Sequence, residues 1–209
     1  FSETFSQTIL EIFPGGGSNR PEPDVRVEGV LFVLDGELEI EFDDIREHLQ
    51  PGSYVYIGPG SNWKINNSSK SPSRVQWIRK VYDFVDGIDA PKTFITNEQN
   101  IIPEPISENG EIWSTTRFVD PRDLRHDMHV NIVNIDPGGA IPFMETHVME
   151  HGIYILQGKG VYRLNSDWIE VEAGDFIWLR AFCPQCCYAG GPEQFRYLLY
   201  KDVNRQIAL

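Results

Sequence analysis

The chain is poor in cysteine, in basic residues and in long apolar runs, and each shortage excludes a class of protein. Its three cysteines all lie within Cys183-Pro-Gln-Cys186-Cys187. They form no disulfide framework, and an odd number in one short loop is more typical of a reducing compartment. Lys and Arg number 18 against 31 Asp and Glu, which gives a net charge of −13. Because phosphate binding relies on clustered Lys and Arg, we expect no nucleic-acid partner.

Membrane and phosphate signals are missing as well. The longest apolar runs, such as GVLFVL and YLLY, are far shorter than the ~20 residues of a membrane-spanning helix, so we expect no membrane partner. Gly15-Gly16-Gly17 has no Lys-Ser or Lys-Thr after it and does not indicate a phosphate loop. The chain begins at Phe1, so we expect the natural N-terminus and any targeting segment to lie outside the sequence.

What the chain does contain is a series of short alternating segments separated by turn residues. Residues 27–42, VEGVLFVLDGELEIEF, read as two strands around the hairpin candidate Asp35-Gly36. Nothing before residue 90 shows a long helical period. We therefore expect an all-β fold.

An internal repeat divides these segments into two similar sets. Residues 35–63 superpose on residues 157–185 with a constant offset of 122, so that Gly36 falls on Gly158 and Trp63 on Gln185. A repeat of short strands predicts two small antiparallel barrels or jelly rolls. We expect a first domain at residues 1–88 and a second at 113–209. Residues 89–112, rich in Pro, Asn and Glu, are expected to form a linker.

Glu145-x-His147-x3-His151 is the strongest chemical signal in the chain. On an extended strand, alternate side chains share a face, so these three groups could point into one interior. Two imidazoles and one carboxylate suit a divalent transition metal and leave positions open for a substrate. The alternative is three polar residues on a solvated strand.

The glycine and ligand spacing around these residues resembles the two motifs of the cupin family. Gly139, Glu145, His147, His151 and Gly158 occupy the first motif, and Gly174 and Gln185 fall in the second. Glu and Gln stand where most cupins have His. That ligand set, with ETHVMEHGIYILQGKGVYRL, GDFIWLRAFCPQ and RYLLYKDVNR, resembles the (S)-ureidoglycine aminohydrolase family of bicupin enzymes. The resemblance implies two tandem cupin barrels, each a double-stranded β-helix or jelly roll.

The same resemblance implies a site in the second barrel. It assigns Mn²⁺ to Glu145, His147, His151 and Gln185, whereas the ligand types alone allow Fe²⁺ equally well. It assigns substrate binding to Glu145, Tyr162, Tyr197 and Lys201, with Tyr197 and Lys201 in catalytic roles. The matching positions of the first repeat, Pro23, Val25, Gly29 and Trp63, offer no metal-binding side chain, so the first barrel is expected to hold no metal.

The implied activity is conversion of (S)-ureidoglycine and water to (S)-ureidoglycolate and ammonia in allantoin degradation. Two alternatives stay open: an Fe(II)-dependent cupin dioxygenase and a non-catalytic bicupin that binds a small ligand. A linker carboxylate could reach the substrate, and Glu98, Glu104 and Glu108 cannot be separated at this level. The resemblance also implies a homo-oligomer, in the cytoplasm for a bacterial type or in the endoplasmic reticulum for a plant type.

Overall fold

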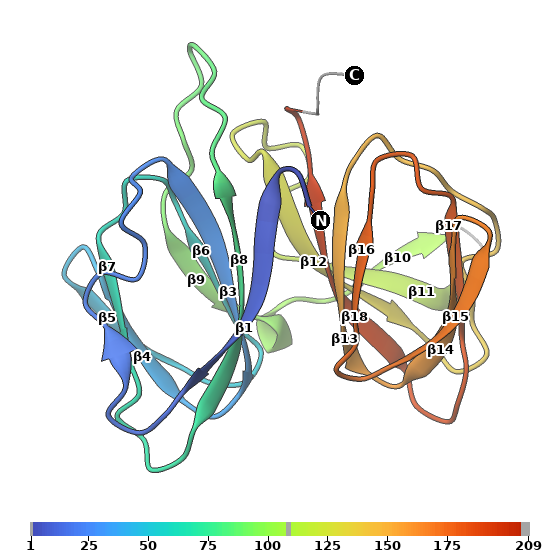
Figure 1. Ribbon diagram of the computed structural model, residues 1–209, viewed down its shortest axis with the longest axis horizontal. Coiled ribbons are helices and arrows are strands. Elements are labelled where there is room, and N and C mark those ends of the chain that lie inside the picture. The colour runs from blue at the N-terminus through green and yellow to red at the C-terminus, as the bar shows by residue number, and fades with distance from the viewer. Residues whose placement is uncertain (1, 108–109, 206–209) are drawn as a thin grey trace. The chain divides into compact units, whose positions relative to one another are not determined.

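The protein is built from β-strands, as the sequence predicts (Figure 1). The computed structural model describes residues 2–107 and 110–205. In that part of the chain the strands are accompanied by one short 3-10 helix, η1 (Glu98–Asn100), and by no α-helix. None of the described segments forms a helix that is long and apolar enough to cross a membrane.

The chain divides into two compact units. One is Thr4–Asn100, and the other comprises Ile101–Leu209 together with Phe1–Glu3. The stretch expected as a linker, residues 89–112, contains β9 (Phe94–Asn97), η1, β10 (Glu104–Ser107) and the start of β11 (Gly110–Arg117). β9 pairs with a strand of the first unit, and β10 pairs with β11 in the second. These short strands therefore extend the sheets on either side of the division.

The first unit contains two antiparallel sheets. One sheet has the order β1-β8-β3-β6-β9, and the other has the order β2-β7-β4-β5. Their strands are β1 (Phe5–Ile12), β2 (Gly17–Ser18), β3 (Val27–Asp35), β4 (Leu38–Phe42), β5 (Ile45–Leu49), β6 (Ser53–Ile57), β7 (Trp63–Asn66) and β8 (Ser73–Val81).

The second unit repeats this plan. Its larger sheet has the order β10-β11-β12-β18-β13-β16, and its smaller sheet has the order β15-β14-β17. The remaining strands are β12 (Met128–Ile135), β13 (His151–Gln157), β14 (Lys159–Leu164), β15 (Asp167–Glu172), β16 (Phe176–Leu179), β17 (Gln185–Ala189) and β18 (Phe195–Asp202).

The repeat seen in the sequence is a repeat of strand topology. The order β1-β8-β3-β6 corresponds to β12-β18-β13-β16, and β7-β4-β5 corresponds to β17-β14-β15. β7 and β17 begin at Trp63 and Gln185, and β8 and β18 begin at Ser73 and Phe195, a separation of 122 in each case (185 − 63 and 195 − 73). The offset predicted from the sequence is thereby confirmed.

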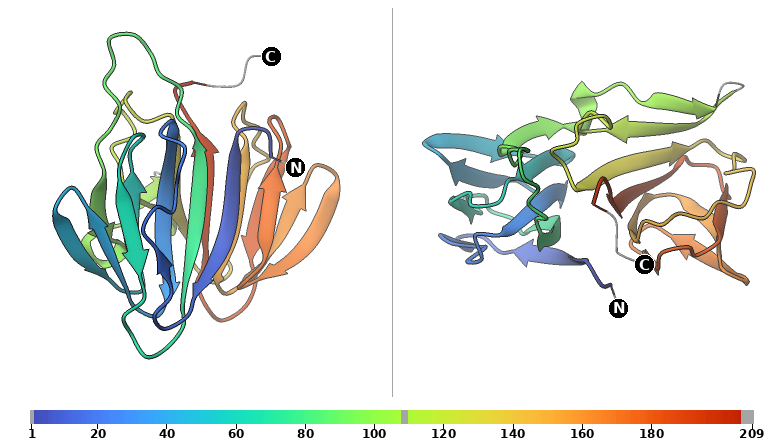
Figure 2. Two further views of the ribbon diagram at one scale, coloured as in Figure 1. Left: turned by 60° about the vertical axis from the view of Figure 1, so that its left-hand side comes forward. Right: turned by 90° about the horizontal axis from the view of Figure 1, so that it is seen from above.

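The strands of both sheets in each unit enclose an interior, which Figure 2 shows from two further directions. In the first unit this interior is filled by apolar side chains from both sheets, among them Leu31, Ile40 and Val75. Trp63, which stands at the position of Gln185, is 3% exposed and belongs to this core. The first barrel is thus packed as a hydrophobic core at the place where the second carries polar groups.

Candidate functional site

The segment before β13 carries two of the expected metal ligands, and it is not a strand. Only His151 lies in β13, whereas Glu145 and His147 belong to the irregular stretch that precedes it. The expectation of one extended strand holding all three residues was therefore wrong. Pro142 has no N–H to offer a strand ladder, and the stretch follows β17 instead of pairing continuously.

Backbone hydrogen bonds to β17 hold this segment in place. The N–H of Glu145 donates to the carbonyl of Gln185 at 3.0 Å, and the N–H of Gln185 donates back to the carbonyl of Glu145 at 2.9 Å. Further along, Ile141 N–H donates to Cys187 O at 2.9 Å. This reciprocal pair sets Glu145 directly beside Gln185, although 40 residues separate them (185 − 145).

Gly139 is required for the close approach of the same segment. A Cβ atom placed there would lie against Ile112 Cγ2 and only 2.8 Å from Ile135 Cγ2. Side chains larger than hydrogen would push the segment away from the barrel wall. This is a physical reason for the glycine that opens the first motif.

The side chains predicted to form the site all line one cavity of about 210 Å³ in the second unit. They are Glu145, His147, His151, Tyr162, Gln185, Tyr197 and Lys201. Glu145 Oε2 lies 2.8 Å from His147 Nε2, and the rings of His147 and His151 are 5.3 Å apart between centroids. Tyr162 Oη donates to Gln185 Oε1 at 2.8 Å, so the tyrosine orients the amide.

The donor set of this cavity suits a divalent cation by its chemistry. Carboxylate, imidazole and amide oxygen are ligands that Mn²⁺ or Fe²⁺ accepts. Among the residues that the structure describes, however, no group of three or more His, Cys, Asp or Glu side chains is gathered closely enough to hold a metal by itself. Glu145, His147 and His151 line the same cavity without forming such a cluster. The match between this cavity and a divalent cation rests on the type of its donors, with Gln185 as the fourth.

Burial sets the protonation of the groups around the cavity. It lowers the pKa of His151 to about 3, with smaller contributions from His147 and Lys201, so the imidazole is neutral, the form that binds metals. Burial also lowers the pKa of Lys201, helped by the nearby Arg117. The pKa values of Tyr162 and Tyr197 are raised well above 10.0, again mainly by burial. Both phenols are therefore protonated hydrogen-bond donors at neutral pH.

The two described linker carboxylates, Glu98 and Glu104, lie in different units. Glu104 Oε2 accepts a hydrogen bond from Arg117 Nε at 3.1 Å, and Arg117 lines the cavity. Glu98 lies in the first unit, where its N–H donates to Gly52 O at 3.0 Å. Glu108 lies outside the described residues.

Sequence reasoning missed three polar residues of the cavity wall, Thr115, Arg117 and Asn131. They lie on β11 and β12, and their alternate spacing was the available signal. That signal was ambiguous, because the opposite face of the same strands also carries the buried polar residues Thr116 and Asn134.

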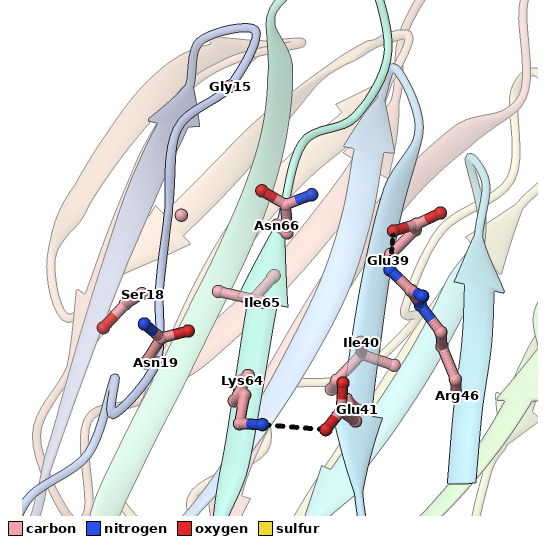
Figure 3. A pocket seen from close by; sticks show the side chains of 11 residues that line it. Gly15, Ser18, Asn19, Glu39, Ile40, Glu41, Arg46, Lys64, Ile65 and Asn66 are labelled. Carbon is pink, nitrogen blue, oxygen red and sulfur yellow. Dashed lines mark hydrogen bonds and ion pairs between the residues drawn. The ribbon is translucent and has the colours of Figure 1, made fainter.

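A wider hollow of about 410 Å³ lies on the first unit (Figure 3). Its charged groups satisfy each other: Lys64 Nζ lies 2.8 Å from Glu41 Oε1, and Arg46 Nη2 lies 2.8 Å from Glu39 Oε2. None of its lining residues is a His or a Cys. The hollow therefore lacks the imidazole donors that line the smaller cavity of the second unit.

Two barrels of this strand order, with a polar donor set in the second, define a cupin protein, and the fold predicted from the sequence is confirmed. A family model described as a cupin domain matches residues 131–200. The chain is 31% identical over 207 residues to the (S)-ureidoglycine aminohydrolase of Escherichia coli, which covers 99% of this chain and 78% of that protein. It is 30% identical to the (S)-ureidoglycine aminohydrolase of Arabidopsis thaliana over 88% of this chain, and it spans 60% of that protein's length.

A solved structure has the same fold. A Pseudomonas aeruginosa protein described as glyoxylate induced superposes with a TM-score of 0.95 at 60% identity, over 100% of this chain and 77% of that one. The chain belongs to the (S)-ureidoglycine aminohydrolase family of cupin proteins.

Proposed function

We propose that the protein is a metal-dependent hydrolase that converts (S)-ureidoglycine and water to (S)-ureidoglycolate and ammonia. The bond broken joins the α-carbon to the amine, and the bond formed joins that carbon to the oxygen of water. The observation that carries the proposal is the gathering of Glu145, His147, His151 and Gln185 with Tyr162, Tyr197 and Lys201 around one cavity. Membership of the aminohydrolase family supports this substrate.

We assign the cation, Mn²⁺ by resemblance to the family, to Glu145, His147, His151 and Gln185. The oxygen donors Glu145 and Gln185 favour a hard cation, although iron would also be accepted. Lewis-acid polarisation at the carbon that bears the departing amine is the chemistry that this cation supplies when bound.

The remaining groups are assigned to substrate handling. Lys201 has no ion-pair or hydrogen-bond partner among the described side chains, and it is half-buried at the cavity. It is placed to hold the substrate carboxylate or to protonate the leaving amine. Tyr197 carries a protonated hydroxyl at the cavity. The hydrogen of Tyr162 Oη is donated to Gln185 Oε1, so Tyr162 would contact the substrate as an acceptor. Glu145 would contact the substrate as well as the cation.

The proposal is tested by following ammonia release from freshly prepared (S)-ureidoglycine by the purified protein. Activity should require added Mn²⁺ and should vanish in Glu145→Ala and His151→Ala. The matched controls are Glu170→Ala and His48→Ala, which change exposed residues away from the cavity and should retain full activity. Ammonia release that persists in both site variants would refute the assignment.

The same preparation decides between the alternatives. Oxygen consumption with an aromatic substrate by the iron-loaded protein would favour the dioxygenase. Tight binding of a ureide without turnover would favour a binding module. We also propose, from the resemblance alone, that the chain forms a homo-oligomer, and light scattering after gel filtration measures its mass.

A further inference from the structure

One wall of the cavity, formed by β11 and β12, has no role in the chemistry assigned above. Arg117 pairs with Asn131 across the two strands, and Thr115 pairs with Val133 two residues along. Residues opposite each other share a face, as do residues two apart. Thr115, Arg117 and Asn131 therefore form one polar patch, and all three line the cavity.

Thr115 and Asn131 are each only 3% exposed. The hydroxyl of Thr115 and the amide of Asn131 nevertheless make no side-chain hydrogen bond to any described residue. The other face of the same strands gives the contrast. There Asn134 Nδ2 donates to Thr116 Oγ1 at 3.3 Å. Buried polar groups are normally paired, and leaving them unpaired is costly. The inner pair therefore faces the cavity, where water or a bound ligand can pair with it.

The charge of the patch indicates which partner fits. Arg117 is already matched by Glu104, which accepts from Nε at 3.1 Å and leaves the other guanidinium N–H donors available. Asn131 presents both a donor and an acceptor, and Thr115 does the same. The carboxylate of the ureide is already assigned to Lys201, so this wall faces the opposite, neutral end of the molecule. A terminal carbamoyl group fits there, because its carbonyl oxygen accepts from Arg117 and its amino hydrogens are accepted by the side-chain oxygens of Asn131 and Thr115.

We propose that Thr115, Arg117 and Asn131 form a subsite for a terminal carbamoyl group, with its carbonyl oxygen on Arg117 and its amino hydrogens on Asn131 and Thr115. The inference rests on the proposed function in one respect: it places the neutral end of the ureide on this wall and leaves the carboxylate to the side of Lys201. It adds that the protein selects ureides over other acylated amino acids.

Equilibrium binding tests the subsite without any turnover. The probes are N-carbamoylglycine and N-acetylglycine, which share a carboxylate and an amide carbonyl and differ in a terminal amino group against a methyl group. Isothermal titration of the Mn²⁺-loaded protein should show roughly tenfold tighter binding of the carbamoyl compound, the size expected for hydrogen bonds to a neutral group.

The variants are Asn131→Leu and Thr115→Val, which keep side-chain volume and remove polar atoms. Each should bring the ratio of the two dissociation constants close to one while changing the affinity for N-acetylglycine by less than about twofold. Thr116→Val is the matched control, because it changes the same residue type on the outer face of β11 and should preserve the wild-type ratio. Retained binding of N-acetylglycine shows in each case that the variant is folded.

Several results would overturn the subsite. One is a wild-type protein that binds the two compounds equally or binds neither. Another is a ratio that Asn131→Leu and Thr115→Val leave unchanged. A third is an equal loss of both affinities in these variants, which would place the carboxylate on this wall.

Failure of the subsite and failure of the proposed function are distinguishable. Ammonia release without a carbamoyl preference removes the subsite and leaves the hydrolase. A carbamoyl preference that the variants abolish, without ammonia release, supports the subsite and removes the hydrolase.

Discussion

At the scale of single residues, Tyr162 is the clearest example of a side chain that acts through another. Its hydroxyl donates to Gln185 Oε1 at 2.8 Å, and the residue is 1% exposed. We expect Tyr162→Phe to keep the packing of the ring but to free the amide of Gln185, and so to weaken Mn²⁺ binding by roughly ten- to a hundredfold, as loss of a ligand's supporting hydrogen bond does.

Titration calorimetry of the metal-free protein with Mn²⁺ measures the change. Tyr188→Phe, which alters an exposed tyrosine of the same strand as Gln185, is the control, and equal affinities in the two variants would contradict the expectation.

At the scale of elements, the segment before β13 depends on Gly139 to lie close to the barrel wall. We expect Gly139→Ala to destabilise the fold by about 1–3 kcal/mol, the usual cost of overpacking, because its methyl group would meet Ile112 and Ile135. The displaced segment carries Glu145 and His147, so Mn²⁺ affinity should fall as well. Urea denaturation and metal titration measure the two effects. Gly190→Ala is the control, since the nearest atom to its added Cβ is 4.0 Å away. If Gly190→Ala lost as much stability as Gly139→Ala, steric overpacking at Gly139 would not be the cause.

Elements also show where sequence reasoning succeeds and where it stops. The repeat predicted two barrels built from corresponding strands, because turns and alternation recur with one spacing and depend on local chemistry. The same local logic placed Glu145 and His147 on a strand, which was wrong, because the segment is held by hydrogen bonds to β17, far along the chain. The patch of Thr115, Arg117 and Asn131 was missed for a similar reason. Which face of β11 and β12 turns inward is decided by the strands that pair with them.

At the scale of the whole molecule, buried histidines make stability depend on pH. Burial, with Lys201 and His126 nearby, lowers the pKa of His129 from 6.5 to about 4. In the unfolded chain this group takes up a proton below pH 6.5, whereas in the fold it does so only near pH 4. The stabilisation is therefore complete above pH 6.5 and is lost as the pH falls towards 4. We expect His129→Gln to reduce this loss by up to ~3 kcal/mol, at about 1.4 kcal/mol per pKa unit.

The measurement is the free energy of unfolding of the metal-free protein in urea, at several pH values between 7 and 4. His151, whose pKa is lowered to about 3, acts in the same direction in both proteins, so the difference between wild type and variant isolates His129. Parallel curves for the two proteins would contradict the assignment.

The two barrels share a topology, yet in the part of the chain that the structure describes the interior of the first is apolar and that of the second carries polar donors, and this asymmetry governs metal content. In the first unit Leu31, Ile40, Trp63 and their apolar neighbours fill the interior, and burying a cation among them would strip its hydration without offering ligands. We therefore expect one Mn²⁺ per chain after dialysis of the loaded protein, measured by elemental analysis, and almost none in Glu145→Ala/His147→Ala. The double variant Glu39→Ala/Glu41→Ala, which removes the carboxylates of the hollow on the first unit, should keep the full content. Two ions per chain, or one ion that survives in Glu145→Ala/His147→Ala, would mean that the cation binds outside the cavity of the second barrel.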